Sequence, residues 1–109
     1  MKHPIRVTVD PDCALAYIEY REPSENDGYL DVVREPDGSV AEYGRDDHYD
    51  PQAPRVMVWF DEDGEIVAFE ILSIEVGEEV AVARDYARDN DLAFPDDIRA
   101  AAASRDPAA

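Results

Sequence analysis

The chain has 109 residues, and its 27 acidic side chains against 10 basic ones give a formal net charge of −17. This length predicts a single domain, over residues 1–109, with a modest core. Such a charge repels nucleic-acid phosphate and anionic lipid, so direct binding of DNA, RNA or a membrane surface is disfavoured. It suits mimicry of nucleic acid, attraction of a basic partner protein, or plain solubility in a salt-rich or GC-rich source.

Cysteine content and hydropathy together predict the cellular compartment of the protein, and the single cysteine suits a reducing one. Cys13 is the sole cysteine, so the chain cannot form an internal disulfide. No apolar run approaches the roughly 18 residues of a membrane span. Residues 1–12 contain no apolar core of a signal peptide. We therefore expect a cytoplasmic protein.

Two short strands are predicted at the start of the chain. Residues 5–9 alternate apolar and polar side chains at the period of a strand. Asp10-Pro11-Asp12 ends this strand, because proline cannot donate to a sheet ladder. Residues 14–20 form the second strand, with Leu15 and Tyr17 on one face. The short link predicts an antiparallel hairpin.

Residues 22–54 form a long central region with weak strand patterns. Residues 28–33 and 40–43 are the two candidate strands, separated by a turn with proline, aspartate and glycine. Residues 44–54 contain two prolines and no periodicity, which predicts a loop. A loop of this length in a small domain is often functional.

The strongest pattern is a hairpin over residues 55–75. Its apolar strands, 56–60 and 65–74, are joined by the acidic turn 61–64. Gly64 can adopt the positive φ of such a turn, and the Asp61 side chain can bond the backbone two residues on.

Strict alternation in the second strand assigns its side chains to two faces. Both faces are largely apolar, so neither is expected to meet water, and we expect the C-terminal helices or another subunit to cover whichever face the sheet would otherwise expose. The first face carries Val67, Phe69 and Ile71, and the second carries Ile66, Ala68, Glu70 and Leu72.

Two helices are predicted to follow. Apolar residues recur at helical spacing over 78–92, and Glu78 and Glu79 suit the first turn of this helix. Pro95 suits the first turn of a second helix that ends near Ser104. Residues 105–109 are predicted to be a flexible tail. The fold class is thus α+β, with four or five antiparallel strands in meander order and one or two helices on one face.

Two segments together resemble a small prokaryotic family, domain of unknown function 2283. Residues 10–18 (DPDCALAYI) are similar to its opening, and residues 56–72 (VMVWFDEDGEIVAFEIL) are similar to its second signature. The resemblance implies a small antiparallel meander without established activity, catalytic residue or cofactor. Some relatives are thought to be encoded beside toxin-like small proteins, which implies an antitoxin or partner-binding role. Ala14 replaces an acidic residue of the pattern, and Ala68 replaces a glycine.

Glu70 is the residue singled out by position, because it interrupts an apolar strand. A buried carboxylate must be paired or protonated. We expect either exposure at an edge or an ion pair with Arg55, Arg84 or Arg88. The functional alternative is a polar anchor for a partner, with Trp59, Asp61 and Asp63 around it.

Other chemistry finds weaker support. The turn has the acidic spacing of a calcium loop, but Trp59 occupies the anchoring position and strands replace the helical flanks. Asp47, His48 and Asp50 form the remaining candidate for a metal or small-molecule site, but no second ligand cluster accompanies them. Cys13 with a distant His48 lacks the local signature of a nucleophile and base.

The sequence therefore predicts no cofactor, metal or catalytic residue. The leading hypothesis is a non-enzymatic interaction module that binds a basic partner protein, in the manner of an antitoxin. The alternatives are a small-molecule or metal-binding protein that uses residues 44–54, and a self-associating domain, such as a homodimer, whose sheet is covered by a second copy.

Overall fold

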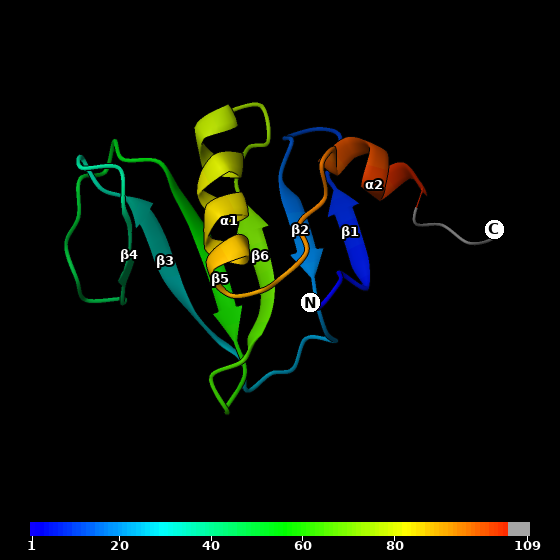
Figure 1. Cartoon of the computed structure of the whole chain (residues 1–109), viewed down its shortest axis with the longest axis horizontal. Coiled ribbons are helices and arrows are strands. Elements are labelled where there is room, and N and C mark those ends of the chain that lie inside the picture. The colour runs from blue at the N-terminus through cyan, green and yellow to red at the C-terminus, as the bar shows by residue number, and fades with distance from the viewer. Residues whose placement is uncertain (105–109) are drawn as a thin grey trace.

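The computed structural model describes residues 1–104 and has the predicted α+β class (Figure 1). It contains six strands and two helices. These are β1 (Arg6–Val9), β2 (Ala16–Glu19), β3 (Gly28–Arg34), β4 (Val40–Tyr43), β5 (Arg55–Phe60), β6 (Ile66–Ile71), α1 (Gly77–Asp89) and α2 (Ile98–Ser104).

The strands form one antiparallel sheet in the order β1-β2-β6-β5-β3-β4. The predicted meander order and the count of four or five strands are therefore wrong. The β5–β6 hairpin lies in the middle of the sheet, with the β1–β2 hairpin beside β6 and the β3–β4 hairpin beside β5. Because β2 pairs with β6, about fifty residues later in the chain, residues 21–27 must pass from one side of the central hairpin to the other.

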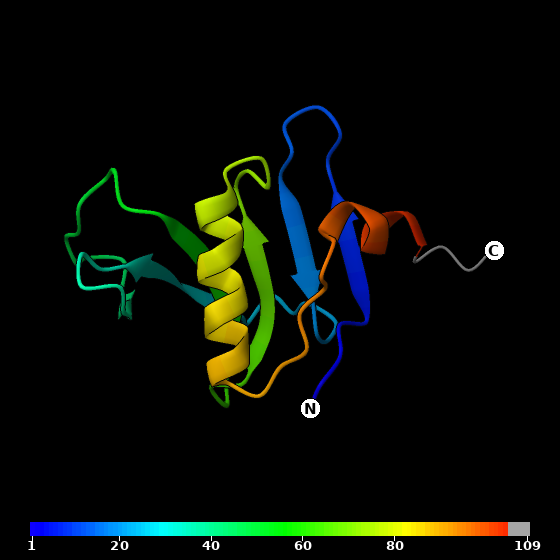
Figure 2. The ribbon, with the colours of Figure 1, turned by 45° about the horizontal axis from the view of Figure 1, so that its top comes forward.

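Helix α1 covers one face of the sheet over β3, β5 and β6, and α2 lies against β1 (Figure 2). The core between α1 and the sheet includes Val82, Ala83 and Ala87 from the helix, all fully buried. The sheet contributes alternate residues to this core. These include Ile18, Val32, Val56, Val58, Phe69 and Ile71.

Phe69 is the centre of an aromatic cluster within this core. Its ring meets those of Tyr20, Tyr86 and Phe94 edge-on, with centroids 5.7, 6.3 and 6.0 Å away. Edge-to-face packing is favourable because the positive edge of one ring meets the negative face of the other. The cluster joins the sheet both to α1 and to the segment between the helices.

A β-bulge in β6 changes the predicted alternation. Trp59 pairs with Ala68, but the next residue, Phe60, pairs with Ile66, so Val67 is an extra residue in the strand. Ile66 consequently joins the core beneath α1, whereas Val67 faces the other side with Ala68. The prediction for these two neighbours was wrong because an inserted residue breaks the period of two.

The turn and α1 follow the local sequence signals, but α2 begins at Ile98, so Pro95 lies before this helix and not in its first turn as predicted. Gly64 has a φ of 82°, and the Asp61 carboxylate accepts a hydrogen bond from the Asp63 N–H across 2.8 Å. Helix α1 ends at Asp89, where Asp91 adopts a left-handed φ of 58° and the Leu92 N–H returns to the Ala87 carbonyl. The Leu92 bond and the left-handed Asp91 together are typical of a Schellman cap, in which glycine is the usual residue at the left-handed position.

The central region is more ordered than its sequence pattern suggested. Residues 22–54 contain two strands, β3 and β4. Strand β3 pairs with β5 over most of its length, and β4 pairs with β3. Residues 44–54 form a loop, as predicted. The predicted tail, 105–109, lies outside the described residues. Within residues 1–104, neither helix has the length and apolar character needed to cross a bilayer.

Candidate functional site

The sheet face opposite α1 carries large side chains that neither α1 nor α2 covers, and we call it the open face. It is defined by the residues that alternate with the core positions of the four inner strands. Its principal members are Tyr17, Ala68, Glu70, Met57, Trp59, Tyr29 and Asp31. Tyr17 and Tyr29 are 36% and 46% exposed, so the aromatic character of this face is accessible to a partner.

A hollow of about 350 Å³ lies at the centre of the open face. Its floor is formed by Val67 and Ala68, which the bulge brings to the same side of the sheet. The loop that crosses between the hairpins forms one wall through residues 23–27. We call this site the open-face hollow; its lining residues are Tyr17, Glu19, Pro23, Ser24, Asp27, Trp59, Val67, Ala68 and Glu70.

Glu70 and Trp59 are in direct contact in this hollow. The indole Nε1–H of Trp59 donates to Oε1 of Glu70 across 3.1 Å. Tyr17 lies opposite Glu70 on β2, and Met57 lies opposite it on β5. Burial raises the pKa of the Tyr17 hydroxyl, and the charge of Glu70 raises it further.

The ion pairs expected for Glu70 are not formed among the described residues. Arg55 lies over the ring of Tyr49, Arg84 lies over the ring of Phe94, and Arg88 bonds Asp85. No lysine, arginine or histidine is among the described residues that line the hollow. The Glu70 carboxylate is thus held by a neutral indole donor rather than by a cation.

Glu19 is the carboxylate of the hollow that does have a cationic partner. Arg6 donates to both of its oxygens, at 3.0 and 2.6 Å. This hydrogen-bonded pair, with the charge of Glu19, raises the pKa of the Arg6 guanidinium further above its usual range. The bidentate geometry fixes Glu19 at the rim and neutralises its charge.

Two other predicted anchors, Asp61 and Asp63, lie outside the hollow. Asp61 accepts bonds from the backbone N–H groups of Asp63 and Glu65 and forms an ion pair with Arg21. Asp63 is exposed at the tip of the turn. The structure therefore brings together Glu70 and Trp59 but leaves these two aspartates as turn residues.

The loop 44–54 folds back over the outer part of the open face. The Tyr49 hydroxyl donates to Oδ2 of Asp31 across 2.8 Å, and its ring lies 5.2 Å from that of Tyr43. The Arg55 guanidinium lies 5.8 Å from the centre of the Tyr49 ring. Tyr49 thus covers the β3–β4 side of the face and leaves the β2–β6–β5 side open.

Two aspartates of this loop accept hydrogen bonds within its own turns. Asp47 accepts a hydrogen bond from the Gly44 N–H, and Asp50 accepts one from the Gln52 N–H. His48 is exposed. Across residues 1–104, no group of three or more His, Cys, Asp or Glu side chains is arranged to hold a metal ion.

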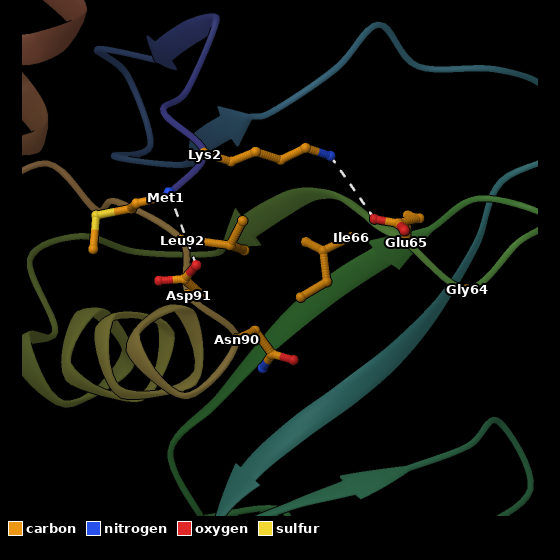
Figure 3. A pocket seen from close by; sticks show the side chains of 8 residues that line it. All are labelled: Met1, Lys2, Gly64, Glu65, Ile66, Asn90, Asp91 and Leu92. Carbon is orange, nitrogen blue, oxygen red and sulfur yellow. Dashed lines mark ion pairs between the residues drawn. The ribbon is translucent and has the colours of Figure 1, made fainter.

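Another hollow lies between the N-terminal residues, the β5–β6 turn and the end of α1 (Figure 3). Its volume is about 510 Å³. Its charges are matched in pairs, because the Met1 amine lies 3.9 Å from Asp91 and Lys2 lies 3.8 Å from Glu65. Because these charges are balanced, they do not favour the binding of either an anionic or a cationic ligand in this hollow.

Tyr17, Glu19 and Val67 line the candidate site but were not predicted from the sequence as site residues. The alternation of β2 did place Tyr17 opposite the core residue Ile18, but it could not show that β2 pairs with β6. The bulge that turns Val67 towards the hollow left no mark in the apolar run of β6.

Comparison of the chain with protein-family models, with curated proteins and with solved structures found no match. The resemblance to domain of unknown function 2283 therefore stays a prediction.

Proposed function

We propose that this protein is a non-enzymatic interaction module that binds a basic partner protein through its open face. One observation carries this proposal: an accessible aromatic face surrounds a carboxylate, Glu70, that has no cationic partner among the described residues. Exposed aromatic side chains around a desolvated centre are typical of protein interfaces. The remaining charges of the chain extend the attraction outward, because a net −17 steers a cationic partner towards the surface.

A basic partner fits this face better than a second copy of the chain does. Self-association through the open face would bring two Glu70 carboxylates into one interface and join two bodies of charge −17. Like charges in an interface cost free energy that a cationic partner avoids. The homodimer remains the alternative that this charge argument disfavours.

The small-molecule or metal hypothesis for the loop 44–54 gains no comparable support. Two of its carboxylates, Asp47 and Asp50, accept hydrogen bonds from backbone N–H groups of the loop itself. The role of the loop that the described contacts support is to cover part of the sheet through Tyr49. An antitoxin role would be one instance of the proposed function, with a basic toxin as the partner.

Site-specific photocrosslinking tests the proposed function. A photoreactive phenylalanine derivative replaces Tyr29 on the open face and, as the matched control, Arg84 on the exposed surface of α1. We expect a basic protein of the native host to crosslink at position 29 and not at position 84. Its association rate with the purified chain should fall steeply as ionic strength rises. Equal crosslinking at both positions, or a rate independent of salt, would refute the proposal.

A further inference from the structure

We infer that the open-face hollow is the receptor for an arginine side chain of the basic partner. The inference rests on the proposed function and specifies which chemical group the face recognises. It starts from the composition of the hollow: two aromatic rings, an apolar floor, and carboxylates without a basic side chain among the described lining residues.

The aromatic rings supply the surface for a planar cation. Tyr17 and Trp59 lie on either side of β6, on the strands β2 and β5 that flank it. A guanidinium stacks on such rings because it is planar, weakly hydrated and attracted to the negative face of the π system. The small side chain of Ala68 lies between the two strands and leaves depth for the group.

Glu70 supplies the charge and the direction. Its Oε1 accepts the Trp59 indole N–H, and the Tyr17 hydroxyl also bonds the carboxylate, so two neutral donors hold Glu70 in place without neutralising its charge. A guanidinium carries several N–H donors in a fixed fork, so it can bond a carboxylate and stack on a ring at once. An ammonium has only a point charge and gains less from this arrangement.

The other two carboxylates of the hollow are less available. Glu19 is neutralised by Arg6, and Asp27 accepts a hydrogen bond from the Ser24 N–H at 2.7 Å. The specific contact is therefore with Glu70. The volume of about 350 Å³ is within the range of sites that enclose a small organic group.

The experiment uses Trp59 as an internal probe, because it is the single tryptophan of the chain. A capped peptide with two arginines is titrated into the full chain, and the indole N–H resonance of Trp59 is followed by NMR together with tryptophan fluorescence. We expect a saturable shift, and an affinity about tenfold lower for Glu70→Gln, because one charge-assisted bond is lost. Glutamine keeps the acceptor for the indole, so the hollow retains its shape.

Glu62→Gln is the matched control, since it removes the same charge from an exposed turn outside the hollow. Equal losses in Glu70→Gln and Glu62→Gln would show attraction by net charge alone and overturn the inference. The same peptide with lysines should bind more weakly, and equal affinity would overturn the assignment to arginine. If Glu70→Gln fails to fold, Tyr17→Leu, at a partly exposed position, provides the second variant and should also weaken arginine-peptide binding.

The inference and the proposed function fail separately. A basic partner that crosslinks at position 29 but binds Glu70→Gln as tightly as the unmodified chain retains the proposed function and overturns the arginine site. The absence of any basic protein crosslinked at position 29 refutes the proposed function. Glu70-dependent binding of the arginine peptide would still support the arginine site in that case.

Discussion

The hydroxyl of Tyr20 donates a 2.7 Å hydrogen bond to the carbonyl of Ala93, which ties the end of β2 to the segment between the helices. Tyr20 is 4% exposed, and its ring meets Phe69 edge-on. Tyr20→Phe keeps the ring contact and removes the hydroxyl, so it should lower the free energy of unfolding by about 1 kcal/mol. Urea denaturation measures this loss. Tyr29→Phe, at a half-exposed position, is the control, and equal effects of the two changes would contradict a role for the Tyr20 bond.

The end of α1 offers a substitution that should stabilise the protein. Asp91 has a left-handed φ of 58° and is exposed. Left-handed conformations cost an L-residue about 1 kcal/mol that glycine does not incur. Asp91→Gly should therefore raise the free energy of unfolding by up to about 1 kcal/mol. Asp91→Asn, which removes the charge near the Met1 amine but tolerates the same φ, separates the two effects. A loss of stability in Asp91→Gly alone would refute the strain argument.

Acid stability should depend on Asp61. The backbone N–H of Glu65 lowers the pKa of the Asp61 carboxyl, and the N–H of Asp63 and the charge of Arg21 lower it further. Because the folded pKa is depressed, the stabilisation is present above the ordinary carboxyl pKa and is lost as pH falls through the folded value. The melting temperature of Asp61→Asn should thus be lower than that of the unmodified chain at neutral pH and should converge with it in acid. Glu62→Gln controls for the lost charge, and an identical acid profile in both variants would contradict the prediction.

Arg34 and Asp85 join β3 to α1 through a hydrogen bond of 2.6 Å. Arg34 and then Arg88 lower the pKa of Asp85, with about a quarter of the Arg34 and Asp85 side chains exposed. A double-mutant cycle with Arg34→Met and Asp85→Asn should give a coupling of about 0.5–1 kcal/mol that declines with salt. The cycle of Asp85 with Arg88, which is 70% exposed, should give a smaller coupling. A larger coupling for Arg88 would reverse the assignment of the main partner.

Alkaline stability should be limited by the buried tyrosines. Burial raises the pKa of Tyr20. Burial is also the main cause of the raised pKa of Tyr86, and its hydrogen bond to Glu42 raises that pKa further. Because both folded pKa values are raised, their contribution to stability is complete below the ordinary pKa of 10 and is lost as pH rises above it. Ultraviolet titration should therefore show a late tyrosine transition that coincides with unfolding by circular dichroism. Full ionisation of all six tyrosines in the folded chain would contradict this prediction.

Features that depend on neighbours along the chain could be predicted before the fold was known. Alternating residues defined the strands, Asp61 and Gly64 defined the turn between β5 and β6, and helical periodicity defined α1. These signals are local, because each arises from backbone geometry and turn chemistry over a few residues. The same logic singled out Glu70 as an unusual polar position.

Which strands pair, and which side chains those pairs bring together, could be seen only in the folded chain. The pairing of β2 with β6 brings Tyr17 to Glu70, and the bulge turns Val67 away from the core and into the floor of the open-face hollow. Hydrophobic burial sets these long-range contacts, and it is non-directional, so a linear pattern of apolar residues does not specify the partner of each strand. The candidate site exists because six short strands, each with a local sequence pattern of its own, pair in an order that those patterns do not predict.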